Sequence, residues 1–276
     1  MPRIMVGTEN SAEVSLYYED FGTGDPVVLI HGWPLTQDSW ELQVGAFVEA
    51  GHRVITYDRR GSGRSTRTWT GYDYDTLATD LHALVEHLDL AAWSLVGFSS
   101  GSGDATRYVA NHGTHRISKL VLASPILIGG PTRAGTVAAS GGEMTADLLA
   151  AARRHRVPML DDLLTRFFSV NGYNVLDEPT RLYHLHTAAS ASPKGAADSI
   201  SALPTANRPE DLARVDVPAL VVHGEDDAFM PYETSGRSVA RAIPDSRTVT
   251  IPNAPHAAPL THPQQWNEAV LAFLAG

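Results

Sequence analysis

The sequence contains no cysteine. This absence excludes disulfide bonds, thiolate metal sites, iron–sulfur clusters and a cysteine nucleophile. The sequence also shows no cluster of residues with metal-ligand spacing, which disfavours haem and metal peroxidase chemistry. We therefore expect no metal and no cofactor, and any covalent catalysis must use another residue.

Positive charge is scarce as well, because 21 Lys and Arg stand against 31 Asp and Glu and give a formal net charge of −10. Such a surface repels polyanions, so we expect no nucleic-acid partner. No uninterrupted apolar run approaches the ~18 residues of a membrane span, and residues 1–10 lack the apolar stretch of a signal peptide. We expect a cytoplasmic protein with no membrane partner; the oligomeric state stays open, a homo-oligomer included.

Short apolar, β-branched runs that stop at or just before glycine or aspartate predict buried parallel strands. These runs are Pro26–Ile30, Val54–Tyr57, Ser94–Val96 and Ala219–Val222. Helical patterns such as Leu77–Leu88 lie between them, and this alternation predicts an α/β fold with a doubly wound, mostly parallel sheet. The alternating segment Glu13–Tyr18, followed by a glycine-rich turn, predicts an antiparallel N-terminal hairpin at the sheet edge.

The length of 276 residues, 43% of them hydrophobic, suits one large domain with an insertion. The strand–helix rhythm stops between residues 129 and 208, where helix-length pieces such as Thr145–His155 and Leu160–Phe168 follow one another. We predict a core of residues 1–128 and 209–276, and a helical cap of residues 129–208 inserted over the carboxyl ends of the strands.

The strongest chemical signal is Gly97-Phe98-Ser99-Ser100-Gly101, which fits G-x-S-x-G between an apolar run and a helical stretch. A strand that turns sharply into a helix strains the backbone at its apex and needs small residues on either side. That turn exposes the apical hydroxyl above the helix N-terminus. The pattern predicts Ser99 as a nucleophile and the amide of Ser100 as a donor to the oxyanion.

The segment His31-Gly32-Trp33-Pro34 follows an earlier predicted strand. Acyl transfer needs two amide donors that converge on one oxygen, and this turn can supply the second from Trp33. Pro34 has no N–H and cannot donate. We expect His31 to brace the loop rather than to take part in the chemistry.

A serine hydroxyl needs a base, and the order serine, acid, histidine along the chain restricts the search to late histidines. His223 lies within a predicted strand end, and His262 opens the terminal helix. His256 lies in a turn-rich loop after a strand, where an exposed base belongs. We therefore predict His256 as the general base.

The acid that orients this histidine should follow the strand that ends at Gly224, where the sequence offers Glu225, Asp226 and Asp227. We favour Asp227, which stands three residues beyond the glycine and four before Pro231. Asp226 is the second choice.

Five motifs together resemble a known family: His31–Leu35, Asp58–Ser65, Gly97–Gly101, His223–Asp227 and Ala254–His256. The sequence is similar to the cofactor-free (non-haem) chloroperoxidases, also called perhydrolases and aryl esterases, of the α/β-hydrolase superfamily. The resemblance covers roughly Glu13–Pro125 and Asp211 to the C-terminus. It implies the α/β-hydrolase fold, a triad of Ser99, Asp227 and His256, and an oxyanion hole made by the amides of Trp33 and Ser100.

The resemblance also assigns structural roles to Asp58, Arg60 and Gly61, and its perhydrolysing members carry a similar Trp-Pro pair in the oxyanion loop. Two positions depart from it. Members commonly have a bulky or apolar residue where Ser100 stands and a glycine where Ser102 stands. The shape of the acyl pocket does not follow from the resemblance.

These observations predict a serine hydrolase that acts on a small ester or lactone through an acyl-enzyme at Ser99, with a perhydrolase (haloperoxidase-like) side activity. Epoxide hydrolases and haloalkane dehalogenases need a carboxylate where Ser99 stands and are excluded. An acyltransferase or cyclase of a biosynthetic pathway would use the same triad with another acceptor. A small-molecule receptor of this fold, without turnover, is the alternative from another class.

Overall fold

The computed structural model describes the backbone of residues 2–127 and 137–276, and the side chains of 2–127 and 142–276. Eight strands form one sheet in the order β1-β2-β4-β3-β5-β6-β9-β10. Their bounds are β1 Arg3–Glu9, β2 Ala12–Phe21, β3 Pro26–Ile30, β4 Arg53–Tyr57, β5 Trp93–Phe98, β6 Ile117–Ala123, β9 Ala219–Gly224 and β10 Ser246–Ile251. From β4 to β10 every neighbouring pair is parallel, while β2 runs antiparallel to β1 and β4. The predicted mostly parallel sheet with an antiparallel N-terminal hairpin is confirmed.

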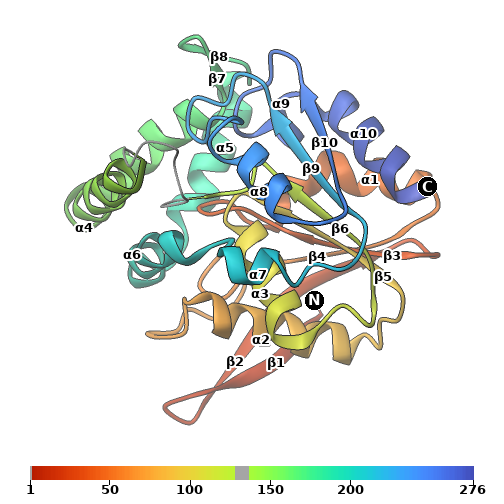
Figure 1. Ribbon diagram of the computed structural model, residues 1–276. Coiled ribbons are helices and arrows are strands. Elements are labelled where there is room, and N and C mark those ends of the chain that lie inside the picture. The colour runs from red at the N-terminus through yellow and green to blue at the C-terminus, as the bar shows by residue number, and fades with distance from the viewer. Residues whose placement is uncertain (1, 128–136) are drawn as a thin grey trace.

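Helices cover both faces of this sheet, as Figure 1 shows. They are α1 Glu41–Glu49, α2 Tyr74–His87, α3 Gly101–His112, α7 Pro209–Leu212, α8 Gly236–Ala242, α9 Ala258–Thr261 and α10 Pro263–Ala275, with a short 3₁₀ turn at Gln37–Trp40. Alternate residues of β3 enter different cores: Val27 packs on the side of α1 and α10, and Val28 on the side of α2 and α3. Burial on both faces explains why the strands are continuous apolar runs.

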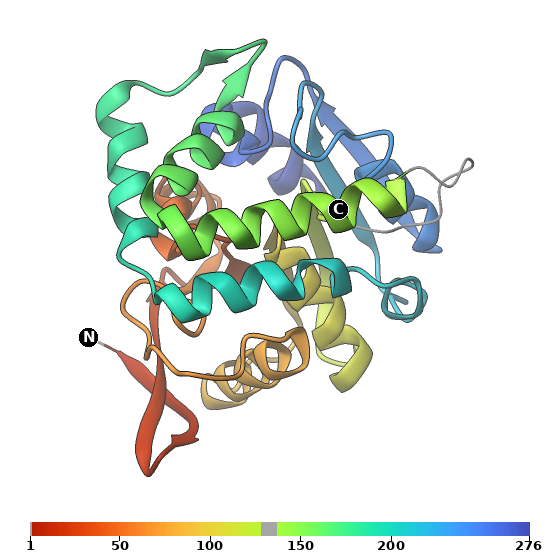
Figure 2. The ribbon, with the colours of Figure 1, turned by 90° about the vertical axis from the view of Figure 1, so that its left-hand side faces the viewer.

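The helical insertion lies between β6 and β9. It contains α4 Val137–Phe167, the short strands β7 Ser169–Val170 and β8 Tyr173–Asn174, α5 Glu178–Ala189, α6 Pro193–Ala202 and a 3₁₀ turn at Leu203–Thr205. Figure 2 shows α4 and α6 side by side across one end of the molecule. The start of the predicted cap, Gly129, and the last residue of the first core segment, 128, lie outside the described residues. The division into core and cap stays a prediction.

Within α4 the helix breaks at His155, whose φ and ψ are −143° and 60°, three residues before Pro158. Proline removes a helix hydrogen bond and disfavours helical geometry just before it. The break falls at the last residue of the first helical piece that the sequence predicts, Thr145–His155. Although α4 is 31 residues long, neither it nor any other helix in the described part of the chain is apolar enough to cross a membrane.

Two strands of the eight-stranded sheet were not predicted from the sequence. One is β1, which pairs with β2 across a tight turn at Asn10 and Ser11, both with positive φ. Two turn residues in the left-handed backbone conformation match the twist of the strands that a two-residue hairpin turn connects. The other is β6, which lies between β5 and β9 at the centre of the sheet and carries the polar residues Ser118 and Lys119.

Candidate active site

Ser99 occupies the apex of the turn between β5 and α3, where its φ is +53°. The glycines on either side allow this turn. A Cβ on Gly97 would lie 2.4 Å from the carbonyl oxygen of Gly101, and a Cβ on Gly101 would lie 2.7 Å from that of Ile30. The strained, glycine-flanked apex has the local geometry of the predicted nucleophile elbow.

Ser99, His256 and Asp227 meet at the carboxyl end of the sheet. Ser99 Oγ lies 2.9 Å from His256 Nε2, and His256 Nδ1 lies 2.7 Å from Asp227 Oδ2. All three side chains are buried. The structure therefore brings together three residues that are 128 or 29 positions apart in sequence, counting from Ser99 to Asp227 and from Asp227 to His256.

Asp227 is the carboxylate at this site, because its two oxygens face four donors. Oδ1 accepts hydrogen bonds from the amides of Phe229 (2.9 Å) and Met230 (2.7 Å), and Oδ2 faces His256 and His223. Burial acts to raise the pKa of Asp227, but the interactions with His256 and His223 outweigh it and hold the pKa well below its usual range. Asp227 is ionised at neutral pH.

The neighbouring acids play no part in this contact. Glu225 is exposed and Asp226 is half-buried, and both line a cavity beside the loop. The amide of Asp226 donates to the carbonyl of Ala254 and so ties the acid loop to the histidine loop.

Three aromatic rings surround the imidazole of His256. Their centroids lie 4.5 Å (Phe167), 5.1 Å (Phe229) and 5.5 Å (Phe98) from that of His256. The hydroxyl of Ser124 donates to the carbonyl of His256 at 2.8 Å. Because Phe167 ends α4, the insertion takes part in holding this histidine.

The other two late histidines lie elsewhere. His262 is the residue that precedes α10, with Pro263 in the first turn, as the sequence predicts. His223 is buried at the end of β9, and its Nε2 lies 3.1 Å from Asp227 Oδ2. This contact with the acid does not follow from the sequence pattern, which indicates only a strand end.

The amide of Trp33, a predicted oxyanion donor, donates a hydrogen bond to Ser100 Oγ at 2.7 Å. The loop lies close against the elbow, since a Cβ on Gly32 would lie 2.9 Å from Ser99 Cβ. For the backbone N–H of Ser100, the other predicted donor, no acceptor occurs among the described residues. Of the two predicted donors, only the Ser100 amide lacks an acceptor among the described residues.

A buried ion pair supports the same hydroxyl. Arg59 Nη1 donates to Ser100 Oγ at 2.9 Å, Nη2 donates to Asp104 Oδ1 at 2.9 Å, and Nε lies 2.8 Å from Asp104 Oδ2. Burial raises the pKa of Asp104 to about 6 in spite of the guanidinium. The sequence does not indicate that Arg59 and Asp104 lie next to the site. Arg59 belongs to the motif Asp58–Ser65, in which the resemblance assigns only structural roles.

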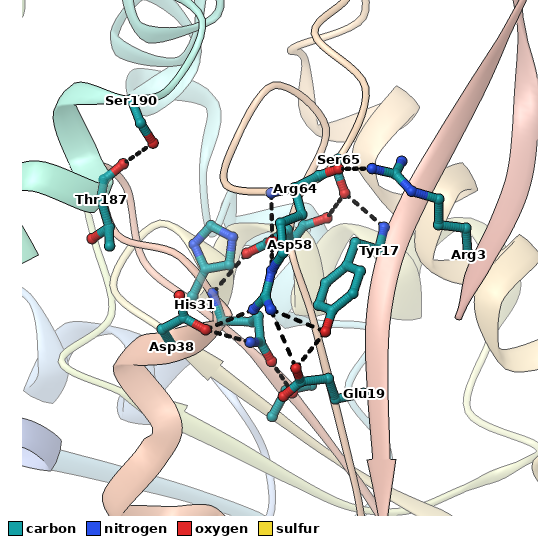
Figure 3. Close-up of polar contacts among 12 residues, drawn as sticks. Arg3, Tyr17, Glu19, His31, Asp38, Asp58, Arg64, Ser65, Thr187 and Ser190 are labelled. Atoms are coloured by element: carbon teal, nitrogen blue, oxygen red, sulfur yellow. Dashed lines mark hydrogen bonds and ion pairs between the residues drawn. The ribbon is translucent and has the colours of Figure 1, made fainter. Parts of the chain in front are cut away.

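His31 and Asp58 brace the loops beneath the site. His31 Nε2 accepts from the amide of Arg59 at 3.0 Å, and burial lowers the pKa of His31 to about 3. Asp58 accepts from the amides of Gln37 (3.0 Å) and Arg64 (2.7 Å), and Figure 3 shows Asp58 and Arg64 beside Tyr17. These contacts fit the structural roles expected for His31 and Asp58.

Ser102 connects the elbow to the end of the insertion. Its hydroxyl donates to the carbonyl of Ser99 at 2.5 Å and accepts from Asn207 Nδ2 at 2.7 Å. Asn207 also donates to the carbonyl of Ile126 and accepts from Thr106. Ser102, where the resemblance leads us to expect a glycine, is thus part of a buried polar network.

A cavity of about 970 Å³ lies between α4 and the acid loop. Asp227 and Phe229 line it, whereas Ser99 and His256 do not. Its other charged lining residues are Glu143, Asp147, Asp162, Glu225, Asp226 and Arg166. Since Phe229 also contacts His256, the cavity adjoins the triad through this ring, and its carboxylates disfavour anionic ligands.

No group of three or more His, Asp or Glu with the geometry of a metal site occurs in the described part of the chain. The side chains that the structure brings together at the site are a buried hydroxyl, an imidazole and a carboxylate in hydrogen-bond contact. This is the combination used in nucleophilic acyl transfer.

Residues 25–263 match the alpha/beta hydrolase fold family. The chain is similar to the crystal structure of a bromoperoxidase from Bacillus anthracis, with 42% identity, a TM-score of 0.93 and coverage of 100% of this chain and 99% of that one. A non-haem chloroperoxidase from Kitasatospora aureofaciens is 36% identical over 95% of this chain and 96% of its own. A bifunctional esterase/perhydrolase from Acinetobacter calcoaceticus is 34% identical with the same coverage.

The similarity extends over nearly the whole of each chain, the insertion included, so it reaches beyond the motifs from which the resemblance was drawn. The protein belongs to the α/β-hydrolase superfamily, in the family of the non-haem chloroperoxidases, perhydrolases and esterases.

Proposed function

We propose that this chain is a serine hydrolase that acts on a small ester or lactone through an acyl-enzyme at Ser99. Its family membership supports hydrolase or perhydrolase activity in general. The observation that carries the finer proposal is the pair of contacts from Ser99 Oγ to His256 Nε2 (2.9 Å) and from His256 Nδ1 to Asp227 Oδ2 (2.7 Å). A base at this distance can remove the hydroxyl proton during attack.

In the first half-reaction Ser99 Oγ attacks the carbonyl carbon while His256 Nε2 accepts the hydroxyl proton. Asp227 stabilises the imidazolium and orients its ring. When the substrate C–O bond breaks, His256 returns the proton to the leaving oxygen, which yields an alcohol and an ester of Ser99. In the second half-reaction His256 deprotonates water, whose oxygen attacks this ester. The acid is released and the Ser99 hydroxyl is restored.

Negative charge develops on the former carbonyl oxygen in both half-reactions and needs hydrogen-bond donors. The Ser100 amide, at the start of α3, supplies one. The Trp33 amide is the second predicted donor, and in this structure it donates to Ser100 Oγ.

Hydrogen peroxide can replace water in the second half-reaction. Its attack on the Ser99 ester gives a peroxy acid and the free hydroxyl, and the peroxy acid then oxidises halide away from the protein. The names of the chloroperoxidase and perhydrolase relatives support this side activity. It needs no redox cofactor.

Two other functions fit the same residues. An acyltransferase or cyclase would pass the acyl group from Ser99 to another acceptor, and a receptor would bind a small molecule without turnover. A panel of esters, lactones and acyl thioesters, assayed with and without added acceptors, separates hydrolysis from acyl transfer.

The central test is covalent labelling with a fluorophosphonate, followed by mapping of the adduct. We expect one adduct, on Ser99, and loss of aryl-ester hydrolysis in Ser99→Ala and in His256→Ala. Because members of a triad act as a unit, the double variant should be about as slow as either single variant. Full activity in Ser99→Ala with loss in Ser102→Ala would contradict the proposal.

A further inference from the structure

The hydroxyl of Ser100 receives two hydrogen bonds. The amide of Trp33 donates to Oγ at 2.7 Å, and Nη1 of Arg59 donates to it at 2.9 Å. Ser100 is 1% exposed, so water does not compete for these contacts. Both donors have fixed positions, because one is backbone and the other is held by Asp104 on two atoms.

A serine hydroxyl has two lone pairs and one proton. With both lone pairs of Ser100 Oγ occupied by N–H donors, its own proton must point in a third direction. No acceptor for this proton occurs among residues 2–127 and 142–276. A buried hydroxyl proton without a partner is costly in a resting structure, which suggests a partner that is present only at another stage.

The position of Ser100 indicates that partner. Ser100 follows Ser99 directly, and its backbone N–H also lacks an acceptor among the described residues. Ser100 Oγ lies 2.7 Å from the amide of Trp33, and a Cβ on the preceding Gly32 would lie 2.9 Å from Ser99 Cβ, so the hydroxyl and the amide of Ser100 are polar hydrogens near Ser99 that remain free to donate. The amide of Trp33 is not equally free, because its single proton is directed at Ser100 Oγ.

We infer that the Ser100 hydroxyl donates a hydrogen bond to the oxyanion that forms at Ser99, and that Trp33 acts through this hydroxyl. The inference rests on the proposed function. Donation by a guanidinium and an amide into the lone pairs of Oγ polarises its O–H bond and strengthens it as a donor. Ser100 is then a catalytic residue, whereas Trp33, Arg59 and Asp104 are positioning residues.

A different arrangement predicts the opposite result. If the Trp33 amide left Ser100 during the reaction and turned to the oxyanion itself, the Ser100 hydroxyl would compete with catalysis. Removing the hydroxyl would then leave kcat unchanged or raise it. Removing a genuine oxyanion donor lowers kcat by about 100-fold or more.

The experiment compares Ser100→Ala, Ser100→Thr and wild type in hydrolysis of a short aryl ester. We expect kcat of Ser100→Ala to fall about 100-fold with little change in KM, and Ser100→Thr, which keeps a hydroxyl, to recover most of the loss. Ser39→Ala is the matched control, because Ser39 is also buried and its hydroxyl only donates to the carbonyl of Thr36. It should keep the wild-type kcat.

Binding of an aryl boronic acid, which forms a tetrahedral anion on serine, separates catalysis from stability. The affinity for the boronic acid should fall in Ser100→Ala by about the same factor as kcat. The Tm of each variant is recorded to detect any loss of stability. If kcat of Ser100→Ala is unchanged or raised, or if its boronate affinity is unchanged, the inference is overturned. Labelling of Ser99 by fluorophosphonate in the same variant would show that the proposed function still holds. Activity that survives Ser99→Ala is a separate result and would contradict the proposed function instead.

Discussion

His223 Nε2 lies 3.1 Å from Asp227 Oδ2, the same oxygen that lies 2.7 Å from His256 Nδ1. Nε2 of His223 is also 2.7 Å from the carbonyl oxygen of Met230. Because both neighbours are acceptors, Nε2 carries a proton and donates it. Asp227 is thus held by one histidine from the strand side and by another from the loop side, which restricts the orientation of its carboxylate.

Replacing His223 should therefore reduce activity as well as stability. We expect His223→Ala to lower kcat about 10-fold with KM nearly unchanged, well short of the ~10⁴-fold loss that follows removal of an orienting carboxylate. His223→Gln keeps an N–H donor and should recover much of the rate. His262→Ala, at the start of α10, serves as the control with normal kcat. Equal rates for His223→Ala and wild type would make His223 purely structural.

The identity of the acid can be tested with three matched variants. Asp227→Asn should lower kcat by ~10⁴ because it removes the negative charge that stabilises the imidazolium. Asp226→Asn and Glu225→Gln should have mild effects, since neither side chain contacts His256. Steady-state hydrolysis of an aryl ester measures all three, and a collapse in Asp226→Asn alone would move the assignment by one residue.

Perhydrolysis should depend on the oxyanion loop. Pro34 fixes the loop backbone next to Trp33, and a carbonyl held there would favour attack by peroxide over attack by water. With acetate and hydrogen peroxide supplied, wild type should form peracetic acid, detected by bromide-dependent bromination of a phenol indicator. Pro34→Leu should lower this signal relative to ester hydrolysis. An unchanged ratio would leave Pro34 with a structural role only.

Stability should fall in acid because of a buried histidine in the insertion. Burial lowers the pKa of His184, on α5, to about 4. As the pH falls below ~6.5, the unfolded chain therefore binds a proton before the folded protein does, and stability is lost progressively down to the folded pKa. The loss amounts to about 3 kcal/mol by pH 4.

Thermal unfolding at pH 7 to 4 measures this effect. His184→Leu should show a smaller decrease in Tm over that range than wild type. His186→Leu, an exposed position on the same helix, should follow the wild-type curve. Parallel curves for wild type and His184→Leu would show that other groups dominate the acid sensitivity.

Local patterns predict the elements that carry the site, because their signals are short-range. The apolar run before Gly97 marks β5, and the G-x-S-x-G spacing marks the elbow. In contrast, β6 is an apolar run diluted by Ser118 and Lys119, and such runs resemble helix segments as much as strands. The segment that forms β1 also lacks strict alternation of polar and apolar residues, so it carries no clear strand signal.

Contacts between distant segments lie beyond such patterns. Ser100 is hydrogen-bonded to Arg59, which is 41 positions away in the sequence, and Asn207 is hydrogen-bonded to Ser102, which is 105 positions away. The sequence shows that serines stand at positions 100 and 102, but only the fold reveals which groups these hydroxyls contact. The same holds for His223, whose role depends on a strand end bringing it next to Asp227.

Asn207 sets a limit on how the insertion can be exchanged between relatives. It is fully buried, has a φ of +49°, and bonds to Ser102, Thr106 and Ile126 of the core. Any chimera that takes the insertion from a homologue and joins it after Asn207 also replaces the side chain that satisfies these three partners. A graft whose second junction lies before Asn207 leaves the underside of the elbow intact, so the exchangeable segment contains all the helices of the insertion but ends before residue 208, the predicted end of the cap.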